Sequence, residues 1–183
     1  MRWILTILFF IFLILSGCLA FYLFHDGIES HTITGPFILL SCLLSLSFVS
    51  AGWWVTLYIA RRQNTLNIIN TSRLSETYTN QVNTLTKVYP QGVQIPYEHM
   101  EIRDDDNIFR AIRAESYILN YFEFITIGIK QGDFDEKLCR EYFCGIFNSQ
   151  LFKSENFIKF HHKRDPKIYE YFIQYAEKWS KNL

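Results

Sequence analysis

The sequence predicts an all-α membrane protein in which a two-span transmembrane helical hairpin leads into a cytoplasmic bundle of about four helices. Three observations support this. Two long uncharged apolar runs occupy the first 60 residues, an arginine pair follows the second run directly, and apolar residues recur at helical spacing through the remainder. We therefore expect a transmembrane hairpin over residues 1–60 and a cytoplasmic helical domain over residues 61–183.

The run at 36–60 is the segment around which the chain is organised. It contains no charged residue, and a helix of this length crosses a hydrocarbon core of roughly 30 Å. Trp53, Trp54 and Tyr58 lie near its end, where amphipathic rings favour the membrane interface. Arg61 and Arg62 then predict that the chain emerges on the cytoplasmic side.

A second uncharged run, 3–24, precedes it and is also long enough to span. Because Arg2 precedes this run and Arg61 follows the other, both termini are expected in the cytoplasm of a bacterium, with the protein in its inner membrane. The segment 15–18 (Leu-Ser-Gly-Cys) also matches a lipobox, so acylation of Cys18 is an alternative that leaves the second span intact. The residues after Cys18 remain apolar, which favours the two-span interpretation.

Charge and motifs restrict the function classes. Before Arg61, Arg2 is the only Lys or Arg and Asp26 and Glu29 are the only acidic residues, so the remainder carries 17 Lys+Arg and 16 Asp+Glu. This balance disfavours direct nucleic-acid binding. No phosphate loop, nucleophile elbow, disulfide framework or zinc signature occurs, so we expect a protein that is not an enzyme, with no cofactor and no metal.

Small and hydroxyl side chains form one face of the second span. Ser41, Ser45, Gly52 and Thr56 share this face by their spacing. The face predicts either close packing on the first span or the wall of a water-filled pore in a homo-oligomer. In the pore interpretation Asn64 and Asn67 extend the lining beyond the membrane, and the candidate gate residues on the adjoining face are Leu40, Leu44 and Phe48.

The remaining chain is predicted to form helices separated by short connections. The first covers 63–86, and a loop with Pro90, Gly92 and Pro96 follows. Three consecutive aspartates, 104–106, suit either a metal ligand set or, as we prefer, a helix N-cap.

The helix at 107–130 is apolar over most of its circumference and is therefore expected at the centre of the bundle. Asn120 and Glu123 should then form a structural polar core with Arg73 or Arg140, although a catalytic role is the alternative. Gly132 is predicted to end this helix, and Asp133 with Glu136 resembles a capping box that opens the next.

Residues 120–123 (Asn-Tyr-Phe-Glu), Gly128 and 132–136 (Gly-Asp-Phe-Asp-Glu) resemble a bacterial membrane family of unknown function. Members of that family join two N-terminal spans to a short helical domain. The layout is also similar to the accessory membrane proteins of type VI-B CRISPR systems. That likeness implies a divergent HEPN-like bundle, an oligomeric pore that permeabilises or depolarises the membrane in antiphage defence, and a functional link to an RNA-guided RNA-targeting nuclease.

The HEPN ribonuclease pattern, an Arg followed by four to six residues and a His, is absent. Arg113 and Asn120 come nearest to it, but an amide does not titrate near neutral pH and cannot replace imidazole. The function predicted first is therefore the pore, with a lipid bilayer and further copies of the chain as partners. The alternatives are a membrane-anchored binding module that recruits a protein or RNA, and a HEPN-like RNase.

Overall fold

The computed structural model describes residues 2–25 and 34–181, and within these ranges all regular secondary structure is helical, with no strand. The α-helices are α1 (Arg2–His25), α2 (Thr34–Leu74), α3 (Glu76–Val88), α4 (Asp106–Gln131), α5 (Glu136–His162) and α6 (Glu170–Ser180), and a 3₁₀ helix, η1, covers Tyr97–Met100. The predicted all-α class is confirmed. The chain divides into two compact units, Met1–Ala60 and Arg61–Leu183, which are described separately.

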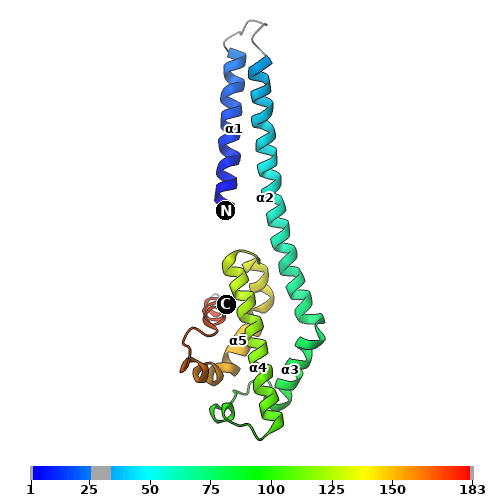
Figure 1. Cartoon of the computed structure of the whole chain (residues 1–183), viewed down its shortest axis with the longest axis vertical. Helices are drawn as coiled ribbons and strands as arrows, with labels where there is room; N and C mark the ends of the chain where they lie inside the picture. Colours follow the sequence, from blue (N-terminus) through cyan, green and yellow to red (C-terminus); the bar gives the residue numbers. More distant parts are fainter. Residues whose placement is uncertain (1, 26–33, 182–183) are drawn as a thin grey trace. The chain divides into compact units, whose positions relative to one another are not determined.

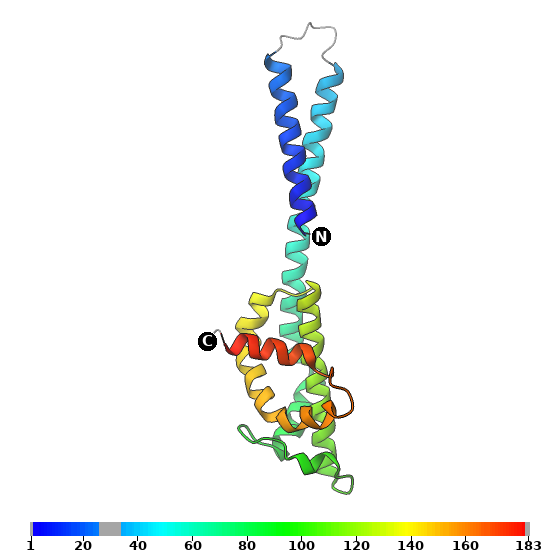
Figure 2. The ribbon, with the colours of Figure 1, turned by 90° about the vertical axis from the view of Figure 1, so that its left-hand side faces the viewer.

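In the first unit α1 and the N-terminal part of α2 lie side by side in both views (Figures 1 and 2). The buried polar side chains here are those of Ser16, Ser47 and Ser50, so small residues form the contact between the two helices. Their hydroxyl groups donate to main-chain carbonyl oxygens of their own helix, which satisfies them without a partner across the contact. Large apolar side chains such as Ile14, Phe21 and Phe48 remain exposed.

One segment of the described chain, Phe37–Ser72, is long and apolar enough to cross a membrane. The apolar stretch of α1 is shorter, Thr6–Tyr22. Within the described residues, only one of the two expected spans is therefore long and apolar enough to cross a membrane. The connecting residues between α1 and α2, including Asp26, Gly27 and Glu29, lie outside them.

In the second unit α4 is the central helix, as its apolar pattern predicts. It packs against α3, α5, α6 and η1, while α6 also packs against α5. Aromatic rings dominate the core: the Phe122 centroid lies 4.7 Å from that of Phe147 and 5.6 Å from that of Phe172. The indole of Trp179 stacks on Phe147 with a centroid distance of 5.1 Å. These rings join α4, α5 and α6 in a single core.

The C-terminal part of α2 belongs to this second unit and is attached to it by three hydrogen bonds. The Nε–H of Arg61 donates to the carbonyl oxygen of Phe134 at 2.7 Å, and the amide of Asp135 donates to Thr65 Oγ1 at 2.7 Å. The hydroxyl of Tyr121 donates to the carbonyl oxygen of Ile68 at 3.1 Å. The residues that follow the apolar run are therefore part of the helical domain rather than a free linker.

Several predicted boundaries change. The helix expected over 63–86 is divided, because Ser75 takes an extended conformation and its hydroxyl caps α3 by accepting from the amide of Tyr78. The prediction that Asp133 caps the start of α5 is wrong: Asp135 is the N-cap and accepts from the amide of Leu138. Gly132 does end α4, with φ of 87°, and Asp105 caps the start of α4, as predicted for the aspartate run.

Candidate functional site

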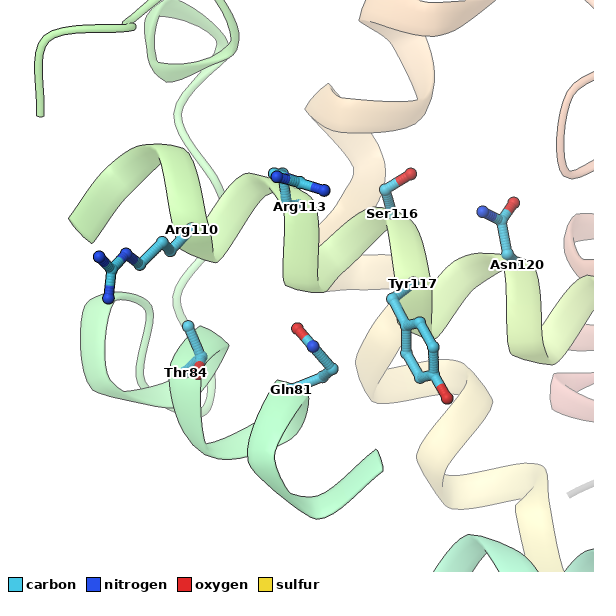
Figure 3. Close-up of a pocket in the computed structure, with 7 residues that line it drawn as sticks. All are labelled: Gln81, Thr84, Arg110, Arg113, Ser116, Tyr117 and Asn120. Carbon is cyan, nitrogen blue, oxygen red and sulfur yellow. The ribbon is translucent and has the colours of Figure 1, made fainter. Parts of the chain in front are cut away.

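A polar pocket of about 520 Å³ lies between α3 and α4 in the helical domain. We call it the α3–α4 pocket. Its lining consists entirely of polar side chains, namely Gln81, Thr84, Arg110, Arg113, Ser116, Tyr117 and Asn120. Figure 3 shows the first two on α3 and the others along α4, with the ring of Tyr117 directed toward α3.

The helical register of α4 explains why these residues meet. Arg110, Arg113, Tyr117 and Asn120 follow one another at alternating spacings of three and four, so they share a single stripe of the helix. A different stripe of the helix carries Ala111, Ala114, Ile118 and Phe122, which are buried in the core. α4 is therefore amphipathic, and its polar stripe turns toward α3 and solvent.

Two guanidinium groups dominate the electrostatics of the pocket, and none of its lining residues is acidic. The Arg110 Nη2 lies 3.2 Å from Asp106 Oδ2, but both side chains are largely exposed, so this ion pair contributes little. The Arg113 Cζ lies 5.9 Å from the ring centroid of Phe109, which holds the guanidinium beside an aromatic face. Arginine presents several N–H donors in a planar fork that matches carboxylate and phosphate groups.

The neighbouring groups add neutral donors and acceptors. The hydroxyl of Thr84 donates to its own helix at the carbonyl oxygen of Asn80, 2.8 Å away. Gln81 and Asn120 make no side-chain hydrogen bond to another part of the described chain. Tyr117 is 40% exposed, so its ring is available as an apolar contact at the side of the pocket. The arrangement suits recognition of an anionic group, and the lining contains no carboxyl, imidazole or thiol side chain.

Arg113 and Asn120, the two residues nearest to the HEPN spacing, both line this pocket (Figure 3). Asn120 was expected in a polar core, but its side chain is exposed, because it lies on the polar stripe of α4. Glu123 is half-buried and accepts from the main-chain amides of Tyr171 at 3.3 Å and Phe172 at 2.7 Å. Its described partners are thus the first amides of α6 rather than an arginine.

The two arginines proposed as partners are placed differently. Arg140 is half-buried on α5, and the side chain of Arg73 lies outside the described residues. The four residues of the expected polar core are therefore not shown as one cluster. Among the described residues, the carboxylate that is buried in the domain belongs instead to Glu115, which was not among the predicted site residues.

Glu115 is completely buried and its carboxylate accepts from Gln150 Nε2 at 2.7 and 2.8 Å and from the hydroxyl of Ser154. Burial raises the pKa of this carboxyl to about 7, against the opposing effect of these hydrogen bonds and of the Lys153 charge. Lys153 is also buried, and its ammonium group donates to the carbonyl oxygen of Tyr89 at 2.6 Å. The sequence contains a signal for the burial of Glu115, since its spacing from Ala111 and Ile118 puts it on the core face of α4.

The candidate pore residues on α2 face outward in the isolated chain. Ser41, Ser45, Gly52 and Thr56 are exposed, whereas Ser47 and Ser50 are buried. The three exposed hydroxyls donate to the carbonyl oxygens of Phe37, Ser41 and Gly52 in the same helix. This side of α2 is therefore available for lipid, water or another subunit.

The candidate gate and the lining beyond the membrane are also accessible. Leu44 and Phe48 are 38% and 75% exposed, and Leu40 is half-buried. Asn64 and Asn67 are exposed on the C-terminal part of α2. Both asparagines belong to the second unit and are described only within it.

Comparison with known proteins identifies the family of the chain but gives no function. The described residues define a helical protein that contains one possible membrane span. Residues 37–179 match the model of the family described as a domain of unknown function, DUF4760, and the chain belongs to that family. No curated protein and no solved structure matches the chain.

Proposed function

We propose that this protein is a membrane-anchored binding module that recruits an acidic segment of a partner protein through the α3–α4 pocket. The observation that carries the proposal is the composition of that pocket, in which two arginines, two amides and three hydroxyl groups meet without a lining carboxylate. Such a site binds an anionic group through bidentate, charge-assisted hydrogen bonds. The near neutrality of the domain as a whole favours a local acidic segment over a long nucleic acid.

The anchoring part of the proposal places α1 and α2 across the bacterial inner membrane, with both termini in the cytoplasm. The apolar stretch of α1, Thr6–Tyr22, is short, but α1 as a whole contains 24 residues and is roughly 36 Å long, so the complete helix can reach across a hydrocarbon core. Its exposed apolar side chains, such as Ile4, Phe10 and Ile14, suit lipid. Arg61 and Arg62 follow α2's apolar part and Arg2 precedes that of α1, which favours this orientation.

The recruitment proposal is tested by photocrosslinking in intact cells. A benzophenone amino acid replaces Tyr117, and its crosslinked products are compared between the wild-type background and a background with Arg110→Gln and Arg113→Gln. We expect a defined protein adduct, through an acidic segment, that disappears when the arginines are replaced. The matched control carries Lys87→Gln and Lys137→Gln, which remove two charges elsewhere.

The crosslinking outcomes are distinct. An adduct with RNA would show that the partner is a nucleic acid, which would contradict the proposal of a protein partner. An adduct that persists without the arginines, or the absence of any adduct, would show that the α3–α4 pocket does not recruit through anionic contacts.

A second candidate function is an oligomeric pore that depolarises the inner membrane in CRISPR-linked antiphage defence. One observation favours it: the face of α2 that carries Ser41 and Ser45 is exposed rather than buried against α1. Because these hydroxyls already donate to their own helix, this face also tolerates lipid. The proposed HEPN-like bundle and the functional link to an RNA-guided nuclease belong to this candidate and depend on it.

The pore is tested by dye release from vesicles that contain the full chain. Ser45→Trp should block release if Ser45 faces the conduit, whereas Leu46→Trp, 47% exposed and about 100° round α2 from Ser45, should leave it unchanged. Equal release by both variants, or no release by the wild type, would exclude this pore geometry.

A further inference from the structure

The polar stripe of α4 continues past the α3–α4 pocket as an aromatic surface. Figure 3 shows the N-terminal part of this stripe, from Arg110 to Asn120. Phe124 lies four residues after Asn120 and seven after Tyr117, so it shares their side of the helix. The side chain of Phe124 is 56% exposed. One side of α4 therefore presents arginines near its N-terminal end and exposed aromatic rings further along.

Phe124 is held in place although it is exposed. Its ring meets the ring of Phe134 edge to face, with the two centroids 5.8 Å apart. Phe134 is itself buried, and its ring lies against Gly128, one turn further along α4. The exposed face of Phe124 is therefore a preformed apolar contact, and a ligand that binds it has little ordering of this side chain to pay for.

The charges around the pocket leave one arginine without a carboxylate. Asp106 pairs with Arg110, and the carboxylate of Asp105 accepts from the first main-chain amides of α4. Among the described residues, no carboxylate forms an ion pair with the guanidinium of Arg113. Arg113 is also exposed, so its N–H donors are available to an anionic group of a ligand.

The other acidic residues of α3 and α4 lie away from Arg113. Glu115 is buried on the core side of α4, and Glu123 accepts from the amides that begin α6. Glu76 opens α3 beside Tyr78, whose ring centroid lies 5.2 Å from that of Tyr121 in the C-terminal half of α4. An acidic group of a ligand is therefore favoured at the arginine end of the stripe and disfavoured at the aromatic end.

Two side-chain amides with unused hydrogen-bonding capacity lie between these ends. Gln81 on α3 and Asn120 on α4 make no side-chain hydrogen bond to another part of the described chain. Each amide offers donors and an acceptor, which the main-chain N–H and C=O groups of an extended peptide require. A helical ligand already satisfies its own main-chain groups. The two amides therefore favour an extended ligand.

The distance between the two ends sets the spacing in the ligand. Phe124 follows Arg113 by 11 positions, which corresponds to roughly 16 Å along the axis of α4. An extended chain advances roughly 3.3 Å per residue, so about five residues cover this distance.

We propose that the segment recruited by the α3–α4 pocket is extended and makes two contacts, an acidic residue on Arg110 and Arg113 and an aromatic residue about five positions away on Phe124. The inference rests on the recruitment proposed above and adds the second contact and its spacing. Charge complementarity fixes the acidic end at the arginines. The aromatic residue contributes affinity because its ring and that of Phe124 remove apolar surface from water.

The test measures binding of fluorescein-labelled peptides to the full chain in mild detergent by fluorescence anisotropy. Each peptide carries Asp-Asp in a Gly-Ser background, with a Phe two or five positions from the nearer Asp, in both chain directions, and a further peptide lacks the Phe. We expect the five-position peptide, in one direction, to bind roughly tenfold more tightly than the peptide without Phe. The two-position peptide should show no such gain, because its Phe cannot reach Phe124.

Substitutions on α4 identify the second contact. Phe124→Ser should remove the gain of the five-position peptide and leave the weaker binding of the acidic residues. Phe124→Leu keeps an apolar contact on Phe134 and should retain most of the gain, which separates loss of the contact from disturbed folding. The control is Ile146→Ser, which removes a 41% exposed apolar side chain from α5 and should leave the binding of every peptide unchanged.

Two results would overturn the second contact: equal affinity of the two-position and five-position peptides, or a gain that survives Phe124→Ser. The absence of binding by every peptide would overturn it as well. Failure of the recruitment proposal is recognised separately. Acidic peptides whose binding is unchanged by Arg110→Gln and Arg113→Gln do not use the pocket. Arginine-dependent binding with no contribution from Phe124 retains the recruitment site and removes only the second contact.

Discussion

The Nε–H of Arg61 donates to the main-chain carbonyl oxygen of Phe134 at 2.7 Å, across 73 positions of sequence. The same junction contains the amide of Asp135, which donates to the buried hydroxyl of Thr65 at 2.7 Å. Two hydrogen bonds thus attach the first turns after the apolar run to the connection between α4 and α5.

Arg61→Lys tests the junction without changing its charge. Lysine lacks the planar guanidinium fork, so we expect the hydrogen bond to Phe134 to be lost and the domain to be destabilised by about 1–2 kcal/mol. Hydrogen exchange of the full chain in detergent should report faster exchange at the Asp135 amide and its neighbours. Arg62→Lys is the control on the exposed side of the same turn. Equal exchange in both variants would show that the Arg61 contact does not hold the junction.

The buried Glu115 carboxyl predicts a pH-dependent stability. Its pKa in the folded chain is about 7, above its ordinary value of 4.5, so the folded state binds more protons between these values. Stability should therefore fall as pH rises from about 4.5 to 7, and be lower by about 3 kcal/mol above that range from this group alone.

Glu115→Gln isolates this effect. The amide is uncharged at all pH values and keeps an acceptor for Gln150, so the slope assigned to Glu115 should disappear, and the variant should be more stable than the wild type at pH 8. Thermal unfolding of both proteins in detergent across this pH range provides the measurement. Identical pH profiles would mean that Glu115 is not the titrating group.

The sequence predicted the helical class and the central position of α4, because a long stripe of apolar residues has few other solutions. It could not predict which side of α4 each polar residue takes. Asn120 and Glu123 are close in sequence, but one is exposed in the α3–α4 pocket and the other binds the amides of α6. That difference depends on the approach of α6, a contact across 49 positions.

The pocket itself was not predicted as a site. Arg110, Arg113 and Tyr117 are visible as one stripe of the helix, but the division of the first soluble helix at Ser75 is what provides α3 as the second wall. A serine within a run of Asn and Thr gives only a weak break signal. The hydrogen bond from the Tyr78 amide to Ser75 stabilises the start of α3, and the packing of α3 on α4 stabilises the division between α2 and α3.

Gly128 is predicted to be intolerant of any side chain. A Cβ at this position would overlap the ring of Phe134, whose Cζ would lie at 3.0 Å and two further ring atoms closer. Gly128→Ala should therefore destabilise the domain by about 1–3 kcal/mol, because the ring sits between α4 and the connection to α5. Gly145→Ala is the matched control: its Cβ would meet nothing within 4 Å, so alanine should stabilise α5 by about 0.5–1 kcal/mol.

Thermal unfolding of the two alanine variants should thus shift in opposite directions relative to the wild type. A Gly128→Ala protein as stable as the Gly145→Ala protein would mean that Phe134 can leave its position at no cost. The close packing described for the turn after α4 would then be wrong.

Glu123 is predicted to cap α6 from another helix. α6 begins after Tyr169, which has a φ of 58° and provides no side-chain cap, while both carboxylate oxygens of Glu123 accept from the amides of Tyr171 and Phe172. A carboxylate at a helix N-terminus satisfies amides that lack a partner and also interacts favourably with the helix dipole. Glu123→Ala should therefore lower the free energy of unfolding by about 1–2 kcal/mol and accelerate hydrogen exchange within Glu170–Ser180, with little change at α3.

Glu123→Gln keeps an acceptor but not the charge, so its stability should lie between those of the wild type and Glu123→Ala. Asn120→Ala, one turn earlier on the exposed side of α4, is the control and should leave α6 unchanged. If exchange in α6 were the same in Glu123→Ala and Asn120→Ala, the carboxylate would be a bystander and α6 would be held by Phe172 and Trp179 alone.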